Sequence, residues 1–135
     1  DPAELQFGYR SSYFQTHKSA IILFAEFEFL KSNEEEIEQK IHKNLNRRLQ
    51  TQPRGKSAGC VFKKCGDIPA GLLLDQAGLK DKKAGDAIIS SKHANFIVNT
   101  GNATASDVKN LINFAKQEVY NKFKYNLELE IEIVE

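Results

Sequence analysis

The segment from Thr104 to Phe123 constrains the fold more than any other, because it joins a helix start signal to a long helical repeat. Thr104 and Asp107 form a capping pair, in which the hydroxyl accepts from a backbone amide three residues on and the carboxylate returns the bond. Apolar residues then recur at three- and four-residue spacing, which predicts a long helix with one apolar face. These apolar residues are Val108, Leu111, Ile112, Ala115, Val119 and Phe123.

A second helix is predicted to start at Ser32 and to end before Pro53. Ser32 and Glu35 form another capping pair, and acidic residues crowd the first turn. Arg47 and Arg48 lie in the last turn, as the helix dipole favours. The helical spacing is carried by Ile37, Ile41, Leu45 and Leu49.

Two segments alternate apolar and acidic residues, which is the pattern of a strand with one face in water. "SAIILFAEFEFL" at residues 19–30 ends in this alternation, and "NLELEIEIV" at residues 126–134 places three glutamates on one face. A short helix is predicted between Pro69 and Gly78, and two short strands in "DAIIS" and "NFIVN". Strands and helices in this irregular order predict an α+β fold.

The composition changes near residue 51, which predicts a boundary between residues 1–50 and residues 51–135. Beyond Pro53 the chain is richer in glycine and small residues, as expected of tight turns between short elements. The opening residues, "DPAELQFGYRSSYF", lack the strong periodicity that would begin an independent domain. We therefore expect further polypeptide before them.

Charge and hydropathy exclude several classes of function. Lys+Arg 19 against Asp+Glu 18 leaves no excess positive field, so nucleic acid is not an expected partner. The longest apolar run, "AIILFA", is far shorter than the roughly 20 residues that a membrane span needs. Two cysteines without a secretory signal indicate a reduced compartment, and we expect a cytoplasmic protein with no membrane partner. Cys60 and Cys65 lack C-x-x-C spacing, so no metal site is expected.

The stretch "GKSAGCVFKKCG" at residues 55–66 places Cys60 between small residues and an aromatic residue, with basic residues on both sides. A buried cysteine is usually a small apolar filler. The alternative is a chemical role for the thiol. The residues of this stretch alone leave both interpretations open.

Five blocks of sequence, taken together and in order, resemble the UDP-N-acetylenolpyruvoylglucosamine reductases. These flavoenzymes make UDP-N-acetylmuramate for bacterial peptidoglycan. The resemblance covers only the C-terminal part of such an enzyme, and residues 1–50 look similar to the last strands and helix of its FAD-binding domain. The blocks are "FGYRSSYF" (7–14), "SAGCVFK" (57–63), "PAGLLLDQAGLK" (69–80), "SSKHANFIVNTGNATASDV" (90–108) and "LELEIEIV" (127–134).

The resemblance implies three catalytic residues. Cys60 stands where the family has a serine that gives a proton to the substrate carbon next to the site of hydride addition. With an unperturbed pKa of about 8.5, a thiol is acidic enough for this task. Arg10 would stabilise the substrate carboxylate as negative charge spreads into it. Glu130 would assist proton delivery or hold the enol, and Glu128 or Glu132 would take its place if the register slipped.

The resemblance also implies the residues that hold substrate and cofactor. Arg48 corresponds to a basic contact with the substrate diphosphate, although its position also suits the helix C-terminus. Arg10, Gly59 and Cys60 would lie against the cofactor. The other residues implied for substrate binding are Tyr9, Lys63, Lys64, His93 and Asn95.

Two departures from the family pattern affect the loops. Lys64 and Cys65 replace an asparagine and a proline, so an amide becomes a cation and the proline that restrained the loop is lost. Asp81 stands where a glycine is usual, which predicts a different turn there.

The function implied is the reduction of UDP-N-acetylglucosamine enolpyruvate, with FAD as cofactor and NADPH as reductant. This chain would supply the proton donor and substrate-binding groups, would need the rest of the reductase polypeptide, and would be inactive alone. A UDP-sugar-binding module without redox activity is the alternative. A third possibility is a structural or interaction domain that binds no such ligand.

Overall fold

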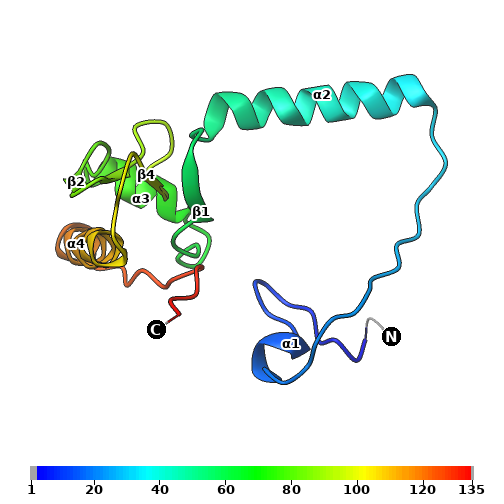
Figure 1. Ribbon diagram of the computed structural model, residues 1–135, viewed down its shortest axis with the longest axis horizontal. Helices are drawn as coiled ribbons and strands as arrows, with labels where there is room; N and C mark the ends of the chain where they lie inside the picture. Colours follow the sequence, from blue (N-terminus) through cyan, green and yellow to red (C-terminus); the bar gives the residue numbers. More distant parts are fainter. Residues whose placement is uncertain (1–2, 135) are drawn as a thin grey trace. The chain divides into compact units, whose positions relative to one another are not determined.

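The structure is a computed structural model that describes residues 3–134 (Figure 1). The chain divides into two compact units, Asp1–Glu38 and Gln39–Glu135, and each is described by itself. The elements, in chain order, are α1 (Tyr13–Thr16), α2 (Glu34–Thr51), β1 (Lys56–Cys60), α3 (Ala70–Gln76), β2 (Lys83–Ala84), β3 (Ala87–Ile89), β4 (Phe96–Asn99) and α4 (Ala105–Phe123).

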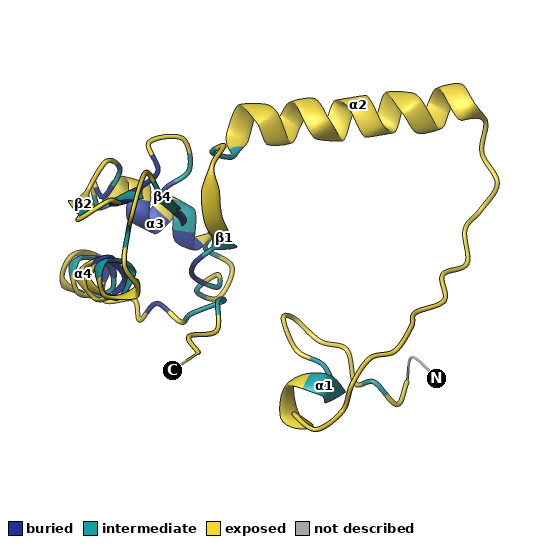
Figure 2. Ribbon diagram, viewed as in Figure 1, coloured by how far each residue is buried: buried dark blue, intermediate teal, exposed yellow. Residues whose placement is uncertain are grey.

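The first unit contains a tight turn at Gly8–Ser11, the one-turn helix α1 and a long irregular segment. The prediction of a strand at residues 19–30 is wrong for this structure, because no strand within residues 3–134 pairs with this segment. A strand needs a partner to bond its peptide groups. Seven large apolar side chains in it are between 62% and 96% exposed (Figure 2): Ile21, Ile22, Leu23, Phe24, Phe27, Phe29 and Leu30.

Helix α2 is confirmed, with its end before Pro53 as predicted. Its start differs by one residue from the expected capping pair. The Asn33 side chain accepts from the Glu36 backbone amide at 2.8 Å, whereas the Ser32 hydroxyl donates to the Glu36 carboxylate. Asn33 therefore performs the capping that was expected of Ser32, because asparagine and serine suit this position equally well. The apolar stripe of the helix is only half covered, with Ile37, Ile41, Leu45 and Leu49 each 44–51% exposed.

The second unit is built on a four-stranded antiparallel sheet in the order β1-β4-β3-β2. Strands β3 and β4 are the two predicted in "DAIIS" and "NFIVN", and they pair through Ile89 and Ile97. Sequence analysis missed β1 and β2. Strand β1 is "KSAGC", whose small residues have low β propensity, so its pairing with β4 rather than local preference makes it a strand.

Helix α4 covers the sheet by contacts with β2 and β3, and it also contacts α3. The capping pair of Thr104 and Asp107 is present as predicted, with both reciprocal bonds formed. The predicted apolar face is confirmed, because four of its six residues are buried and the other two pack against the core. The dark ribbon in Figure 2 shows that the buried residues gather between these elements, whereas none of residues 3–38 is buried. This mixture of helices with an antiparallel sheet agrees with the predicted α+β class.

The predicted strand at residues 126–134 is also corrected. This segment forms one isolated bridge, from Leu129 to Phe62, rather than a ladder. Its alternation is still visible, because Leu127 is buried and Glu128 is exposed. Within the described residues, no helix is long and apolar enough to cross a membrane.

The turn at Asp81 keeps a glycine-like conformation, against the expectation of a different turn. Its φ is +64°, in the left-handed region, and its amide donates to the Ile89 carbonyl at 2.9 Å. Aspartate tolerates this region better than most residues, yet still at a cost.

We expect Asp81→Gly to stabilise the second unit by up to about 1 kcal/mol, because glycine adopts positive φ without strain. The measurement is urea denaturation followed by circular dichroism. Lys82→Gly, at the next position, has no positive φ to relieve and should lower the free energy of unfolding. A loss of stability in Asp81→Gly equal to that in Lys82→Gly would contradict the assignment of strain to Asp81.

Candidate functional site

Cys60 ends β1 immediately after an irregularity in the sheet. The pairing of β1 with β4 shifts between Ser57 and Cys60, and Gly59 adopts a φ of +85° there. Bulges of this kind bend a strand and redirect its side chains, and they occur often beside active sites. The thiol therefore stands at a bend that only glycine at position 59 adopts without strain.

The C-terminal segment lies against the loop that follows Cys60. The Glu130 amide donates to the Val61 carbonyl at 2.8 Å, and the Lys63 amide donates to the Glu128 carbonyl at 2.9 Å. Glu130 is half-buried, whereas Glu128 is exposed. Two of the predicted catalytic residues are thus close in the fold, because Glu130 bonds to the residue that follows Cys60.

Asn95 holds the same loop from its other side. Its side-chain nitrogen donates to the Phe62 carbonyl at 2.8 Å, and its side-chain oxygen accepts from the Phe62 amide at 2.9 Å. Its own carbonyl accepts from the Val61 amide at 2.8 Å. The expected substrate contact of Asn95 stays a prediction, but the structure shows this side chain buried, with both polar ends engaged by the protein.

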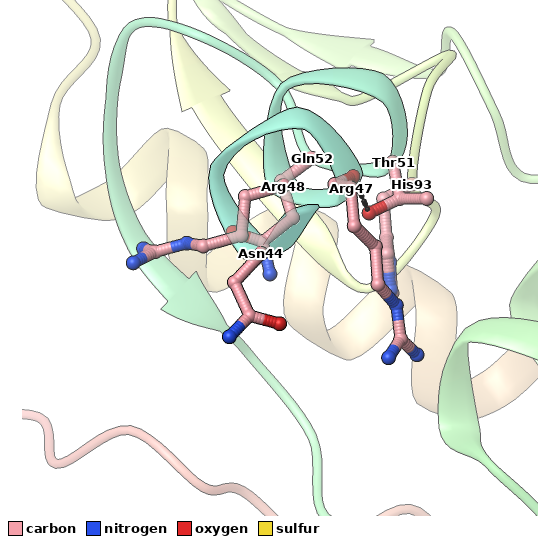
Figure 3. Close-up of a pocket in the computed structure, with 6 residues that line it drawn as sticks. All are labelled: Asn44, Arg47, Arg48, Thr51, Gln52 and His93. Carbon is pink, nitrogen blue, oxygen red and sulfur yellow. Dashed lines mark hydrogen bonds between the residues drawn. The ribbon is translucent and has the colours of Figure 1, made fainter. Parts of the chain in front are cut away.

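A pocket of about 430 Å³ lies between the last turns of α2 and the loop before β4 (Figure 3). Arg48 and His93, both expected at the substrate, line it together. In Figure 3 the Arg48 side chain points away from that of Arg47, with Asn44 drawn between them. Two guanidinium groups and an imidazole make this pocket suitable for an anion. Its lining residues are Asn44, Arg47, Arg48, Thr51, Gln52 and His93.

The His93 ring is fixed by several neighbours. Its Nδ1 accepts from the Asn95 amide at 3.2 Å, so the neutral ring carries its proton on Nε2. It packs edge-on to Phe96, and a Cβ on Gly71 would come within 2.9 Å of it. Burial lowers the pKa of His93 and the charge of Lys80 adds to this, while a hydrogen bond to its own backbone opposes it. Free of ligand, the ring is therefore a neutral donor at pH 7.

Lys92 ties the two sides of this pocket together. Its Nζ donates to the Leu49 carbonyl in the last turn of α2 at 2.6 Å. The Ser90 hydroxyl accepts from the Lys92 and His93 amides at 3.1 and 3.3 Å and so shapes the loop. Lys92 thus binds a carbonyl that the helix end leaves without an intrahelical partner.

Lys63 and Lys64 each lie near a carboxylate at a long ion-pair distance. Lys63 Nζ is 3.6 Å from Glu128 Oε2, and Lys64 Nζ is 3.5 Å from Asp67 Oδ1. Pairs this exposed contribute about 0–1 kcal/mol, so an incoming phosphate would compete well for either ammonium group.

Tyr9 and Arg10 lie in the first unit, on the Gly8–Ser11 turn. Gly8 and Ser11 exchange two backbone hydrogen bonds, of 2.9 and 3.3 Å, and Arg10 has a φ of +52°. Its guanidinium lies 5.9 Å from the centre of the Tyr9 ring. A left-handed backbone is uncommon for arginine, and such strain concentrates at functional sites.

Sequence reasoning missed several residues of this site. Arg47 and Lys92 were not assigned to it, although the Arg47–Arg48 pair at a helix end and the cation beside His93 were available signals. Thr51 and Gln52 carried no signal of their own. Among residues 3–134, no group of three or more His, Cys, Asp or Glu side chains is arranged to hold a metal ion.

Comparison with known proteins identifies the family. The family model described as "UDP-N-acetylenolpyruvoylglucosamine reductase, C-terminal domain" matches residues 50–134. The chain belongs to the UDP-N-acetylenolpyruvoylglucosamine reductase family. The recognition made from the five sequence blocks is therefore confirmed.

Individual relatives agree with this assignment. The chain is 43% identical over 127 residues to a UDP-N-acetylenolpyruvoylglucosamine reductase of Francisella tularensis, covering 93% of this chain and 44% of the relative. It is 42% identical over 132 residues to the one of Anoxybacillus flavithermus, covering 97% of this chain and 44% of the relative. The crystal structure of UDP-N-acetylenolpyruvylglucosamine reductase (MurB) from Thermus caldophilus matches with a TM-score of 0.82 and 40% identity. That match covers 97% of this chain and 46% of the solved chain, so this chain spans less than half the length of these relatives.

We expect pyrophosphate to raise the pKa of His93, because an anion in the pocket favours the charged imidazolium. The measurement is NMR titration of the ring with and without pyrophosphate.

Arg47→Ala and Arg48→Ala should each weaken pyrophosphate binding by about tenfold, the loss expected of one charge-assisted bond. Arg54→Ala is the matched control, because Arg54 does not line this pocket and its loss should leave the binding unchanged.

Proposed function

We propose that the protein containing this chain is a flavin-dependent, NADPH-using reductase of the cytoplasm. It would convert UDP-N-acetylglucosamine enolpyruvate to UDP-N-acetylmuramate for peptidoglycan synthesis. The observation that carries the proposal is the junction of the Cys60 loop with the Glu130 segment, inside a domain that the family model matches. Residues 51–135 would be the substrate-binding domain and residues 1–50 the end of the FAD-binding domain.

Cys60 acts as the proton donor in this proposal. The thiol gives its proton to the substrate carbon that neighbours the site of hydride addition, and Sγ is left as a thiolate. A general acid must lie close to the reacting carbon and must lose its proton at modest cost. The bend at Gly59 supports this role, because it presents position 60 beside the half-buried Glu130. Glu130 then assists proton delivery.

Arg10 stabilises the negative charge that spreads into the substrate carboxylate during the reaction. A guanidinium suits this task, because it stays charged and offers planar paired donors. Tyr9 contacts the substrate beside it. The positive φ of Arg10 supports a functional position, since the turn holds it in an uncommon conformation.

The basic groups of the second unit bind the diphosphate of the nucleotide sugar. Arg48 and His93 share an anion-suited pocket that also contains Arg47. Lys63 and Lys64 stand on the loop after Cys60, where their weak pairs with carboxylates would yield to phosphate. Lys64 replaces the amide of the family pattern, so it would bind phosphate through charge.

The bend at Gly59 and Cys60 leaves room for the flat ring of a cofactor. Apart from Gly59 and its two chain neighbours, no heavy atom of the described residues lies within 4 Å of the position that a Cβ on Gly59 would take, so this face of the loop is open. Gly59 and Cys60 would line the ring there, and Arg10 is the third residue that we propose contacts the cofactor. When bound, FAD reduced by NADPH supplies the hydride.

The remaining polypeptide of the reductase is the proposed partner of the first unit. The exposed residues 19–30 and the half-exposed stripe of α2 support this, since so large an apolar surface is unusual in a folded protein. The chain alone would then lack most of the flavin site and would be inactive.

In the intact reductase, we expect Cys60→Ser to keep its turnover and Cys60→Ala to lower it by about 10²–10⁴-fold, the usual contribution of a general acid. Serine retains an O–H at the donor position, whereas alanine removes the donor. The assay is NADPH oxidation with the enolpyruvate substrate. Cys65→Ala is the control and should turn over normally. Equal activity in all four proteins would remove Cys60 from the mechanism.

We expect the backbone amides of residues 19–30 to exchange slowly with deuterium in the intact protein and rapidly in the 135-residue chain. Pairing with the missing part would protect them, because a ladder bonds the peptide groups that are otherwise open to water. Mass spectrometry of peptides measures this, with residues 105–123 of α4 protected in both proteins as the control. Rapid exchange in both would show that the rest of the polypeptide does not cover this segment.

A further inference from the structure

The side chain of Asn95 takes the place of a backbone peptide group in the sheet. Strands β1 and β4 pair as far as Cys60 and Phe96, and the next bond joins the Val61 amide to the Asn95 carbonyl. Before Asn95 the chain turns away, with the Phe96 amide bonded to the His93 carbonyl at 3.0 Å. The amide side chain of Asn95 then bonds both the N–H and the C=O of Phe62, as a further residue of β4 would have done.

Burial makes these bonds matter. Asn95 is 6% exposed and Phe62 is 3% exposed, so water is excluded from both polar groups of Phe62. A buried peptide group without a partner costs about 1–3 kcal/mol, so Phe62 would move away from any side chain that could not bond it. Cys60 lies two residues before Phe62, and Gly59 before it is conformationally free. Within residues 3–134, Asn95 is the only residue whose side chain is shown to bond both the N–H and the C=O of Phe62.

We propose that Asn95 is a positioning residue for Cys60: its amide holds Phe62 in line with the sheet and thereby fixes where the thiol points. In this role Asn95 acts through the loop, by its two bonds to the Phe62 main chain, rather than through a contact with the substrate. The effect on the thiol follows from the geometry alone, whereas the effect on turnover rests on the proposed function.

The first test measures the reactivity of Cys60 in the intact protein with Cys65 as an internal reference. Trypsin separates the two thiols, because cleavage after Lys56, Lys63 and Lys64 leaves "SAGCVFK" and a peptide that begins at Cys65. Brief alkylation under native conditions, followed by mass spectrometry, gives the ratio of the two rates. We expect Asn95→Leu to change this ratio by about tenfold or more. An unchanged ratio in the folded variant overturns the proposal.

A second variant separates positioning from a general loss of stability. Asn95→Asp keeps an acceptor for the Phe62 amide but, when ionised, has no donor for the Phe62 carbonyl. When protonated it regains that donor, so its rate ratio should return toward the native value as pH falls. Asn99→Leu is the matched control. The Asn99 side-chain oxygen accepts from the Gly101 and Ala103 amides at 2.9 and 3.1 Å, so this substitution also removes two hydrogen bonds of an asparagine. Asn99 is the last residue of β4, whereas Cys60 pairs with Phe96 at the first. A ratio that changes equally in Asn99→Leu, or that stays altered in Asn95→Asp at every pH, overturns the proposal.

The kinetic test uses the same variants in the intact reductase. A displacement of the donor by about 1 Å lowers kcat by on the order of 10²-fold, with KM for the nucleotide sugar changed little. Loss of substrate affinity at normal kcat would instead identify Asn95 as a substrate ligand and would overturn the positioning role. If the native protein shows no reductase activity, the proposed function fails, while the thiol ratios still decide the role of Asn95.

Discussion

The backbone hydrogen bonds of Val61 and Phe62 are the constraint on which the rest of the second unit depends. Both side chains are core residues, so their peptide groups are out of water and must find partners inside the protein. The ladder between β1 and β4 ends just before them. Asn95 supplies partners from one side and Glu130 from the other, at 2.8–2.9 Å. This need explains why sequence blocks some 35 and 70 residues beyond Cys60 both meet at its loop.

The pocket lined by Arg47, Arg48 and His93 lies at the C-terminal end of α2, and a helix C-terminus ordinarily repels anions. The C-terminus of a helix carries the equivalent of about half a negative charge. Arg47 and Arg48 bring two full positive charges to this end, so the positive sign prevails. Lys92 and the Thr51 hydroxyl also bond terminal carbonyls, of Leu49 at 2.6 Å and Arg47 at 2.8 Å, which removes exposed acceptors from the pocket wall. An arginine at this position can therefore complement the helix end and also face the pocket, so the two interpretations of Arg48 do not compete.

Sequence alone predicted the elements whose patterns are local. The face and capping pair of α4 followed from the 3.6-residue repeat, which is self-sufficient evidence for a helix. Strand β1 was missed, because its small residues become a strand only by pairing with β4. The candidate site residues came mainly from the family resemblance, which named Arg48 and His93 separately; the structure places both in one pocket with Arg47, which the resemblance did not name. The expected substrate contact of Asn95 stays a prediction, and its bonds to Phe62 were not foreseen, because they depend on burial and no sequence pattern reports which polar side chains are buried.

The two alternating segments show what a two-residue period does and does not establish. It determines which side chains share a face, but it does not supply the partner that makes a strand. Residues 126–134 obtain two backbone bonds from the loop after Cys60 and bury Leu127. Residues 19–30 obtain no strand partner within the described chain, and seven of their large apolar side chains stay in water. Burying each contributes about 2 kcal/mol, before the entropy cost of ordering the segment is subtracted. Exposed apolar surface of this extent is unusual in a folded protein, and it is the structural basis of the proposal that the remaining polypeptide of a reductase covers residues 19–30.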